Sequence, residues 1–188
     1  MNDVIQAAAE LQTICQSQDW QFCFIGGLAL QRWGEPRRTV DVDLSLFVGF
    51  GDEPQFYDVL LKHFAPRIPD AAAFARERRV LLLRSSKGVG LDVSLAGLPY
   101  EALVIDRSSY FIYAPDISLR TCSAEDLIVL KAFAGRGRDW VDVEGIIVRQ
   151  TGKLDWHYIH EQLRPLAELK DAPEILDQLD ARRVEFEQ

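Results

Sequence analysis

The sequence predicts an α/β (α+β) protein in which a mixed first part is followed by a helical C-terminal region. Three observations lead to this prediction. Apolar and polar residues alternate along residues 40–46 and again along 89–95, which is the two-residue period of a strand. Apolar residues recur at helical spacing along residues 3–17. From Ser123 to Glu187 the pattern becomes helical and predicts about four segments.

The length and composition are those of an ordinary globular protein. The chain has 188 residues, of which 48% are hydrophobic and 27% are charged. This length fits one domain or one domain with a small helical appendage, and we expect a core in residues 1–120 with residues 121–188 packed on it. No apolar run approaches the ~20 residues that a membrane span requires, and the N-terminus lacks the pattern of a secretory signal. We therefore expect a cytoplasmic protein with no membrane partner.

The net charge and the cysteines argue against two classes of site, a broad nucleic-acid-binding surface and a cysteine metal site. The net charge of −8 disfavours a broad electrostatic surface for nucleic acid, although it leaves room for a local basic groove. The three cysteines are an odd number, show no metal-ligand spacing and lie among apolar neighbours. We expect them to be buried free thiols.

The first elements lead into a glycine pair. Residues 3–17 predict an amphipathic helix, and a short strand is expected at 22–25. Gly26 and Gly27 then open a short helix at 28–33, which a following glycine and proline end.

Strands and helices then alternate. Residues 40–46 predict a strand with one apolar and one polar face, and residues 56–64 predict a helix. Strands at 80–84 and 89–95 are separated by the turn sequence SSKGVG and predict a hairpin. A further short strand is expected at 110–113.

Two aspartates share the polar face of the strand at 40–46. Residues two apart in a strand point the same way with Cα atoms roughly 6.5–7 Å apart, so Asp41 and Asp43 can reach one site. Two close carboxylates raise each other's pKa unless a cation lies between them, and Mg²⁺ or Mn²⁺ prefers such oxygen ligands. Asp92 has the parity to supply a third carboxylate. The alternative is a solvent-facing strand surface.

The glycine pair adds a phosphate-binding feature. Gly26 and Gly27 lead from a strand into a helix, where bare backbone N–H groups near the positive end of the helix bind phosphate oxygens. A tight turn alone is the alternative. The glycine pair and the two acidic strands together are more specific than any one of them.

The segments GGLALQRWGEPRRTVDVDL and GLDVSLA resemble the signature of the DNA polymerase β-like nucleotidyltransferase superfamily. The segment SAEDLIVLKAFAGRGRDWVDVEGII further resembles the helical region of bacterial nucleotidyltransferases related to AbiEii-type toxins, in which a helix lysine precedes an RDxxD-like segment. Lys131, Arg138, Asp139 and Asp142 stand at those positions. The resemblance covers about residues 20–150.

The resemblance implies a nucleotidyltransferase fold, with a short mixed β-sheet flanked by helices and a helical C-terminal region. Asp41 and Asp43 would coordinate the metal ions, and Asp92 would hold the second ion and help to deprotonate the acceptor hydroxyl. The two glycines would bind the terminal phosphates of a nucleoside triphosphate. Lys131 could add positive charge to that phosphate tail, although an isolated lysine on a helix is usually solvated.

Several other polar residues admit two interpretations. Arg37, Arg38 and Thr39 precede the acidic strand and could meet phosphate or acceptor, or could form an exposed basic loop. Asp139 and Asp142 could cap a helix or pair with arginines without touching substrate, and we favour that structural role.

The resemblance therefore implies a metal-dependent enzyme that transfers a nucleoside monophosphate from a nucleoside triphosphate to a hydroxyl group and releases pyrophosphate. The acceptor could be an RNA such as tRNA, a protein, or a small molecule such as an aminoglycoside, and the acidic net charge favours the last two. A cognate antitoxin is a further expected partner. The alternative from another class is a catalytically silent nucleotide-binding or toxin-antitoxin module, against which the three retained aspartates speak.

Overall fold

The structure is a computed structural model that describes residues 2–187. It contains two compact units, each of which combines two stretches of the chain. The first unit comprises Met1–Leu28 and Arg38–Cys122, and the second comprises Ala29–Arg37 and Ser123–Gln188. The division into a catalytic core, residues 1–120, and a helical region, residues 121–188, stays a prediction.

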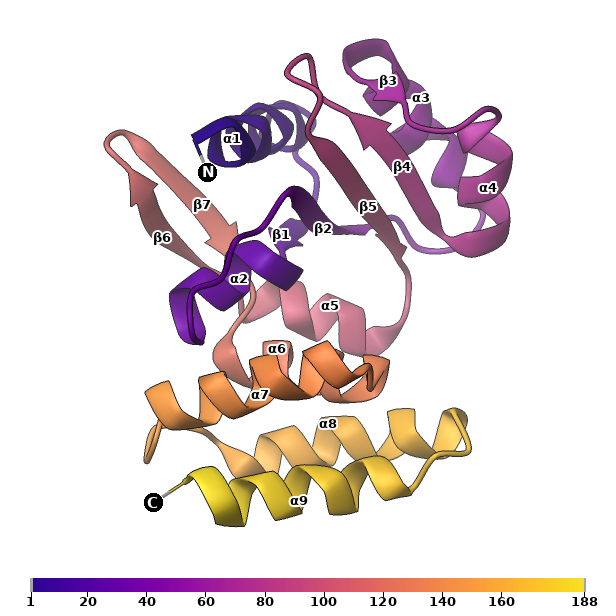
Figure 1. The fold of residues 1–188 in the computed structure, drawn as a ribbon. Helices are drawn as coiled ribbons and strands as arrows, with labels where there is room; N and C mark the ends of the chain where they lie inside the picture. The colour runs from indigo at the N-terminus through magenta and orange to yellow at the C-terminus, as the bar shows by residue number, and fades with distance from the viewer. Residues whose placement is uncertain (1, 188) are drawn as a thin grey trace. The chain divides into compact units, whose positions relative to one another are not determined.

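The first unit is built on a seven-stranded mixed sheet with the strand order β3-β4-β5-β2-β1-β7-β6 (Figure 1). The strands are β1 (Phe22–Phe24), β2 (Asp41–Phe47), β3 (Ala65–Pro66), β4 (Val80–Arg84), β5 (Gly90–Ala96), β6 (Ser109–Ala114) and β7 (Ile117–Thr121). The β2–β5 and β1–β7 pairs are parallel, and the other four pairs are antiparallel. The predicted α/β class with a mixed sheet is confirmed.

The first unit also contains helices, several of which share a core with the sheet. They are α1 (Asn2–Ser17), α3 (Glu53–His63), α4 (Ala71–Arg78) and α5 (Pro99–Asp106), while α2 (Gly26–Trp33) begins in the first unit and ends in the second. The main core contains the apolar residues of β2 and β5 with residues from α1, α3 and α4. Alternation along each strand puts these apolar side chains on one face, so the polar side chains of β2 and β5 lie on the other.

Alternation predicted these strands well. The predicted hairpin is β4 with β5, whose antiparallel register joins Leu82 to Asp92. The helix expected at 28–33 starts two residues earlier, because Gly26 and Gly27 are the first residues of α2. The strand expected at 22–25 ends at Phe24. The elements β3, α4, α5 and β7 were not anticipated from the sequence.

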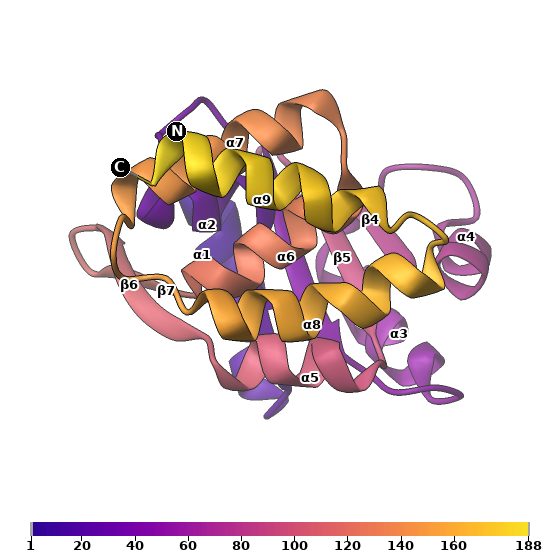
Figure 2. The ribbon, with the colours of Figure 1, turned by 90° about the horizontal axis from the view of Figure 1, so that it is seen from below.

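The second unit is helical, as predicted for the C-terminal region. Its four further helices are α6 (Ala124–Ala134), α7 (Gly137–Arg149), α8 (Trp156–Leu169) and α9 (Glu174–Phe186). Figure 2 shows α8 and α9 side by side, and α6 contacts α7, α8 and α9. Ser123 begins α6 by accepting a hydrogen bond from the Asp126 N–H group, and Gly135 ends it in the left-handed conformation.

Within residues 2–187, none of the helices combines the length and the apolar character needed to cross a membrane. All three cysteines are buried thiols that are not joined in disulfides, as the sequence predicted.

Candidate active site

The register of two parallel strands brings the predicted aspartates together on one face of the sheet. Asp43 on β2 is the direct partner of Asp92 on β5, and Asp41 is the partner of Gly90. Partners in adjacent strands point to the same side of a sheet, and Asp41 shares that side with Asp43 because they are two residues apart. All three aspartates are partly exposed, whereas the residues between them are buried. The three carboxylates therefore share one partly exposed face.

The start of α2 packs against one of these carboxylates. A Cβ atom at Gly26 would lie 2.1 Å from Oδ2 of Asp43, and the φ angle of Gly26 is +56°. Both facts favour glycine, because residues with a side chain rarely adopt this backbone conformation and a Cβ atom would displace the Asp43 carboxylate. The Ile25 N–H group also donates to the Asp43 carbonyl oxygen over 3.0 Å. The N-terminal end of α2 is thus held beside Asp43.

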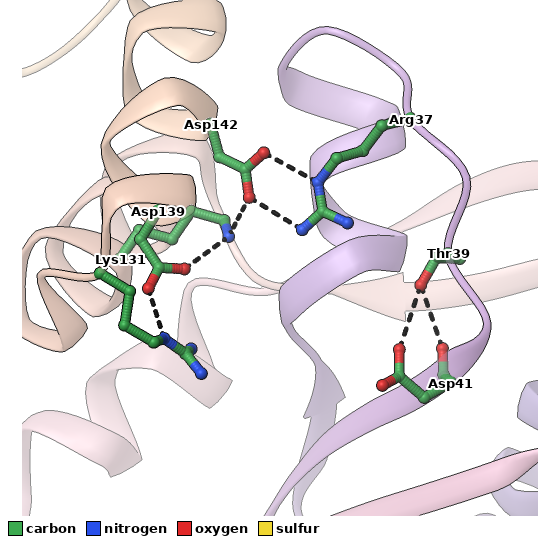
Figure 3. Close-up of polar contacts among 7 residues, drawn as sticks. Arg37, Thr39, Asp41, Lys131, Asp139 and Asp142 are labelled. Carbon is green, nitrogen blue, oxygen red and sulfur yellow. Dashed lines mark hydrogen bonds and ion pairs between the residues drawn. The ribbon is translucent and has the colours of Figure 1, made fainter.

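Thr39 links the second glycine to the first aspartate of the strand. Its buried hydroxyl group donates to the Asp41 backbone carbonyl oxygen over 3.2 Å and lies 3.4 Å from Oδ1 of the same residue (Figure 3). A Cβ atom at Gly27 would lie 2.3 Å from this hydroxyl oxygen. Arg38, the preceding residue, is exposed. Thr39 therefore orients the chain that enters β2.

Asp92 has a partner that the sequence did not suggest. The Nη2 atom of Arg67 lies 2.6 Å from Oδ1 of Asp92, and both side chains are about one-third exposed, at 27% and 31%. Burial raises the pKa of the Asp92 carboxyl, Arg67 opposes this shift, and the negative charge of Asp41 adds to it. The net result is a pKa above the ordinary value for aspartate. The effect of Asp41 is the mutual repulsion expected of clustered carboxylates.

The donor set suits a hard divalent cation, although it is not preassembled as a metal site. Among residues 2–187, no group of three or more histidine, cysteine or acidic side chains converges closely enough to hold a metal ion. Asp41 contacts Thr39, Asp43 faces Gly26, and Asp92 contacts Arg67. Three carboxylates on one face are nevertheless the oxygen ligands that Mg²⁺ and Mn²⁺ prefer, and a cation would relieve the repulsion between Asp41 and Asp92. The residues therefore fit such an ion by chemistry and by strand register.

The other predicted residues form a buried ionic cluster in the second unit. Lys131 Nζ lies 2.6 Å from Oδ2 of Asp142 and 3.3 Å from Oδ1 of Asp139, and these three side chains are at most 7% exposed. Arg37 donates two hydrogen bonds to the Asp142 carboxylate, of 2.8 Å and 2.9 Å (Figure 3). Arg136 contacts the second oxygen of Asp139 at 2.7 Å. Lys131 is thus buried and paired, unlike the solvated lysine that was the alternative, and its contact with phosphate stays a prediction.

This cluster shifts the acidity of Asp142. Burial raises the pKa of its carboxyl, but hydrogen bonds and charge from Arg37 and Lys131 outweigh burial and hold the pKa below its usual value. Asp139 and Asp142 do pair with arginines, as favoured from the sequence. Within the second unit, the arrangement joins α6, α7 and Arg37 to one another through charge.

A family model identifies the chain. The model for the nucleotidyl transferase AbiEii toxin of type IV toxin-antitoxin systems matches residues 11–185. The chain belongs to this AbiEii family. No curated protein matches the chain at a significant level.

The chain is also similar to several solved structures. An antigenic nucleotidyltransferase-like protein from Paracoccidioides brasiliensis is 16% identical, with a TM-score of 0.53 over 96% of this chain and 94% of that protein. The antibiotic-resistance factor ANT(2″)-Ia in complex with adenylyl-2″-tobramycin is 16% identical, with a TM-score of 0.49 over 99% of each chain. The lincomycin-bound lincosamide antibiotic adenylyltransferase LnuA is 10% identical, with a TM-score of 0.49 over 73% of this chain and 92% of that one. Only the first likeness is strong enough to support the fold.

As a member of the AbiEii family, the chain is a nucleotidyltransferase of the polymerase β-like superfamily. The match includes residues of both units, among them the candidate metal ligands of the first unit and the buried ionic cluster of the second. The resemblance stated from the sequence is therefore confirmed at the level of family, fold and enzyme class.

Proposed function

We propose that this AbiEii-family chain transfers a nucleoside monophosphate from a nucleoside triphosphate to a hydroxyl acceptor, with Mg²⁺ or Mn²⁺ as cofactor and pyrophosphate as the other product. One observation carries the proposal. Asp43 and Asp92 are register partners on parallel strands, and Asp41 lies two residues away on the same face. Acidic side chains on one face of the sheet support the binding of a divalent ion, which assists in-line phosphoryl transfer.

Each carboxylate has a proposed role. Asp41, Asp43 and Asp92 would hold the divalent ion, which supplies charge neutralisation at the phosphates when bound. Asp92 is also the proposed general base for the acceptor hydroxyl.

The glycine pair is the proposed phosphate site. Gly26 and Gly27 open α2, and the backbone N–H groups of a helix N-terminus favour anions. Neither position accommodates a Cβ atom without displacing Asp43 or Thr39, so the backbone there stays bare. The triphosphate would lie against this backbone, next to the metal ligands.

The remaining candidates for contact with substrate are Arg37, Arg38, Thr39 and Lys131. Arg38 is exposed and is free of the geometric constraint of the buried cluster, so it is the favoured cation of the Arg37, Arg38 and Thr39 segment for phosphate or acceptor. Arg37 and Lys131 are held by Asp142, which accounts for them structurally. Lys131 is also a proposed phosphate ligand. A lower nucleotide affinity in Lys131→Gln would support this role.

The acceptor is proposed from the family and from charge. A toxin of a type IV toxin-antitoxin system acts on a cellular target and has a cognate antitoxin, and we propose both for this chain. The net charge of −8 favours a protein or a cationic small molecule over tRNA as acceptor. The separate contacts of the three carboxylates favour a second candidate, a silent module that binds nucleotide or antitoxin without transfer.

Label transfer distinguishes these functions. The purified chain is incubated with each α-labelled nucleoside triphosphate and Mg²⁺, together with pooled tRNA, cell protein or aminoglycosides. We expect label in one acceptor fraction, loss of transfer in Asp41→Asn with Asp43→Asn, and unchanged transfer in the exposed control Asp58→Asn. Absence of transfer with retained triphosphate binding would favour the silent module, and absence of both would contradict the nucleotidyl-transfer proposal.

A further inference from the structure

Arg67 reaches the candidate metal site from a distant part of the sheet. It follows β3, and its backbone N–H group donates to the Leu82 carbonyl oxygen over 2.9 Å. Leu82 on β4 is in turn the register partner of Asp92 on β5. The Arg67 side chain thus passes over β4 to reach β5, and two strand spacings are about 10 Å. Its Nη2 atom ends 2.6 Å from the Asp92 carboxylate.

The neighbouring strand residue leaves space for the guanidinium group. A Cβ atom at Gly90 would lie 2.6 Å from Nη1 of Arg67 and 3.8 Å from Cβ of Asp41. Gly90 is the register partner of Asp41 and lies two residues before Asp92. The guanidinium group is therefore seated on bare backbone between the aspartates, and not merely extended into solvent past them.

The position of this cation matters for metal binding. A guanidinium group holding Asp92 both occupies a carboxylate oxygen and adds positive charge where a divalent ion would bind. A partly exposed ion pair contributes little to folding stability, so a stabilising role alone does not account for the Arg67–Asp92 pair. We propose that Arg67 competes with the divalent cation for Asp92 and must release this carboxylate before the ion is bound by all three aspartates. This inference rests on the proposed metal-dependent function.

Direct metal binding tests the competition without any assay of transfer. The full chain is stripped with a chelator and titrated with Mn²⁺, and free Mn²⁺ is followed by electron paramagnetic resonance. Arg67→Gln is compared with Arg78→Gln, which removes the same charge from an exposed arginine of α4. We expect Arg67→Gln to bind Mn²⁺ about threefold to fivefold more tightly than Arg78→Gln. Arg67→Lys keeps the charge and should bind like the wild-type chain.

A second variant displaces Arg67 without removing it. Gly90→Ala places a methyl group against the flexible end of the arginine, so it should also tighten Mn²⁺ binding. In the double variant of Arg67→Gln with Gly90→Ala the effects should not add, because both act on the same contact. Thermal unfolding of each variant establishes that the fold is intact.

The outcomes separate this inference from the function beneath it. Mn²⁺ binding by all variants with equal affinity, or weaker binding by Arg67→Gln than by Arg78→Gln, overturns the competition and leaves the metal-dependent function standing. Failure of the wild type and of every variant to bind Mn²⁺ overturns both. If Arg67→Gln binds Mn²⁺ and the wild type does not, the competition is supported in its strongest form.

Discussion

Gly26 and Asp43 approach so closely that a Cβ atom on the glycine would lie 2.1 Å from a carboxylate oxygen of the aspartate. We predict that Gly26→Ala displaces this carboxylate and lowers nucleotidyl transfer by about a hundredfold, because small misplacements at a reacting site have large effects on rate. The strained backbone, with φ of +56°, should cost only about 1 kcal/mol of stability. Initial rates and urea unfolding measure the two effects.

The matched control for this substitution is Gly88→Ala. Gly88 also has a positive φ, of +81°, but a Cβ atom there meets nothing within 4 Å. This variant should show the backbone strain and keep its activity. Equal activity loss in the two variants would mean that strain, and not the contact with Asp43, explains the effect.

Asp142 is predicted to be the critical residue of the buried ionic cluster. Asp142→Ala leaves Lys131 with the Asp139 carboxylate at 3.3 Å and removes the two hydrogen bonds that Arg37 donates to Asp142. Loss of one partner from a buried ion pair costs about 3 kcal/mol, which urea unfolding would detect. Arg136→Ala removes an arginine that is 79% exposed and should cost about 0–1 kcal/mol. A similar small cost for both would contradict the cluster's stabilising role.

The same carboxylate should make folding stability sensitive to acid. The pKa of Asp142 is lower in the folded chain than its ordinary value of 3.8, so its contribution is fully present above that value and is lost as the pH falls through the folded pKa. We expect the urea concentration at the unfolding midpoint of the wild type to decrease as the pH is lowered below about 4. Asp142→Asn should show a smaller fall over that range, and an identical pH dependence would argue against this assignment.

The cysteines are predicted to be inert in the folded chain. Burial raises the pKa of the Cys15 thiol to about 12, so almost no thiolate is present at pH 8. Cys23 and Cys122 are also buried. A disulfide-exchange reagent should label none of the three thiols within minutes in the native protein and all three in denaturant. Rapid native labelling of Cys15 would reveal local opening of α1.

Sequence periodicity located the acidic strands because β2 and β5 each have one apolar and one polar face. Other elements carry weak patterns. The helix α4 is rich in alanine and arginine, and α5 is apolar over most of its length, so neither shows one clear apolar stripe. The strand β3 has only two residues, too few for any period. These elements therefore escaped prediction for identifiable physical reasons.

The candidate site was predicted in its composition but not in its contacts. The acidic residues follow from alternation, whereas the parallel pairing that sets Asp43 beside Asp92 depends on a long crossover that no local pattern encodes. Arg67 lies in an irregular segment after β3 and has no periodic signal. The burial of Lys131 depends on two carboxylates from α7, which only tertiary structure reveals.

The parallel pairing of β2 with β5 also has a consequence during synthesis. A ribosome adds Asp41 and Asp43 well before Asp92, and β5 cannot join β2 until the hairpin with β4 has emerged. A nascent chain that ends before Asp92 therefore has Asp41 and Asp43 without the third acidic residue. On the proposed mechanism, a chain terminated before Asp92 would bind no divalent ion with all three aspartates and would not transfer a nucleotide.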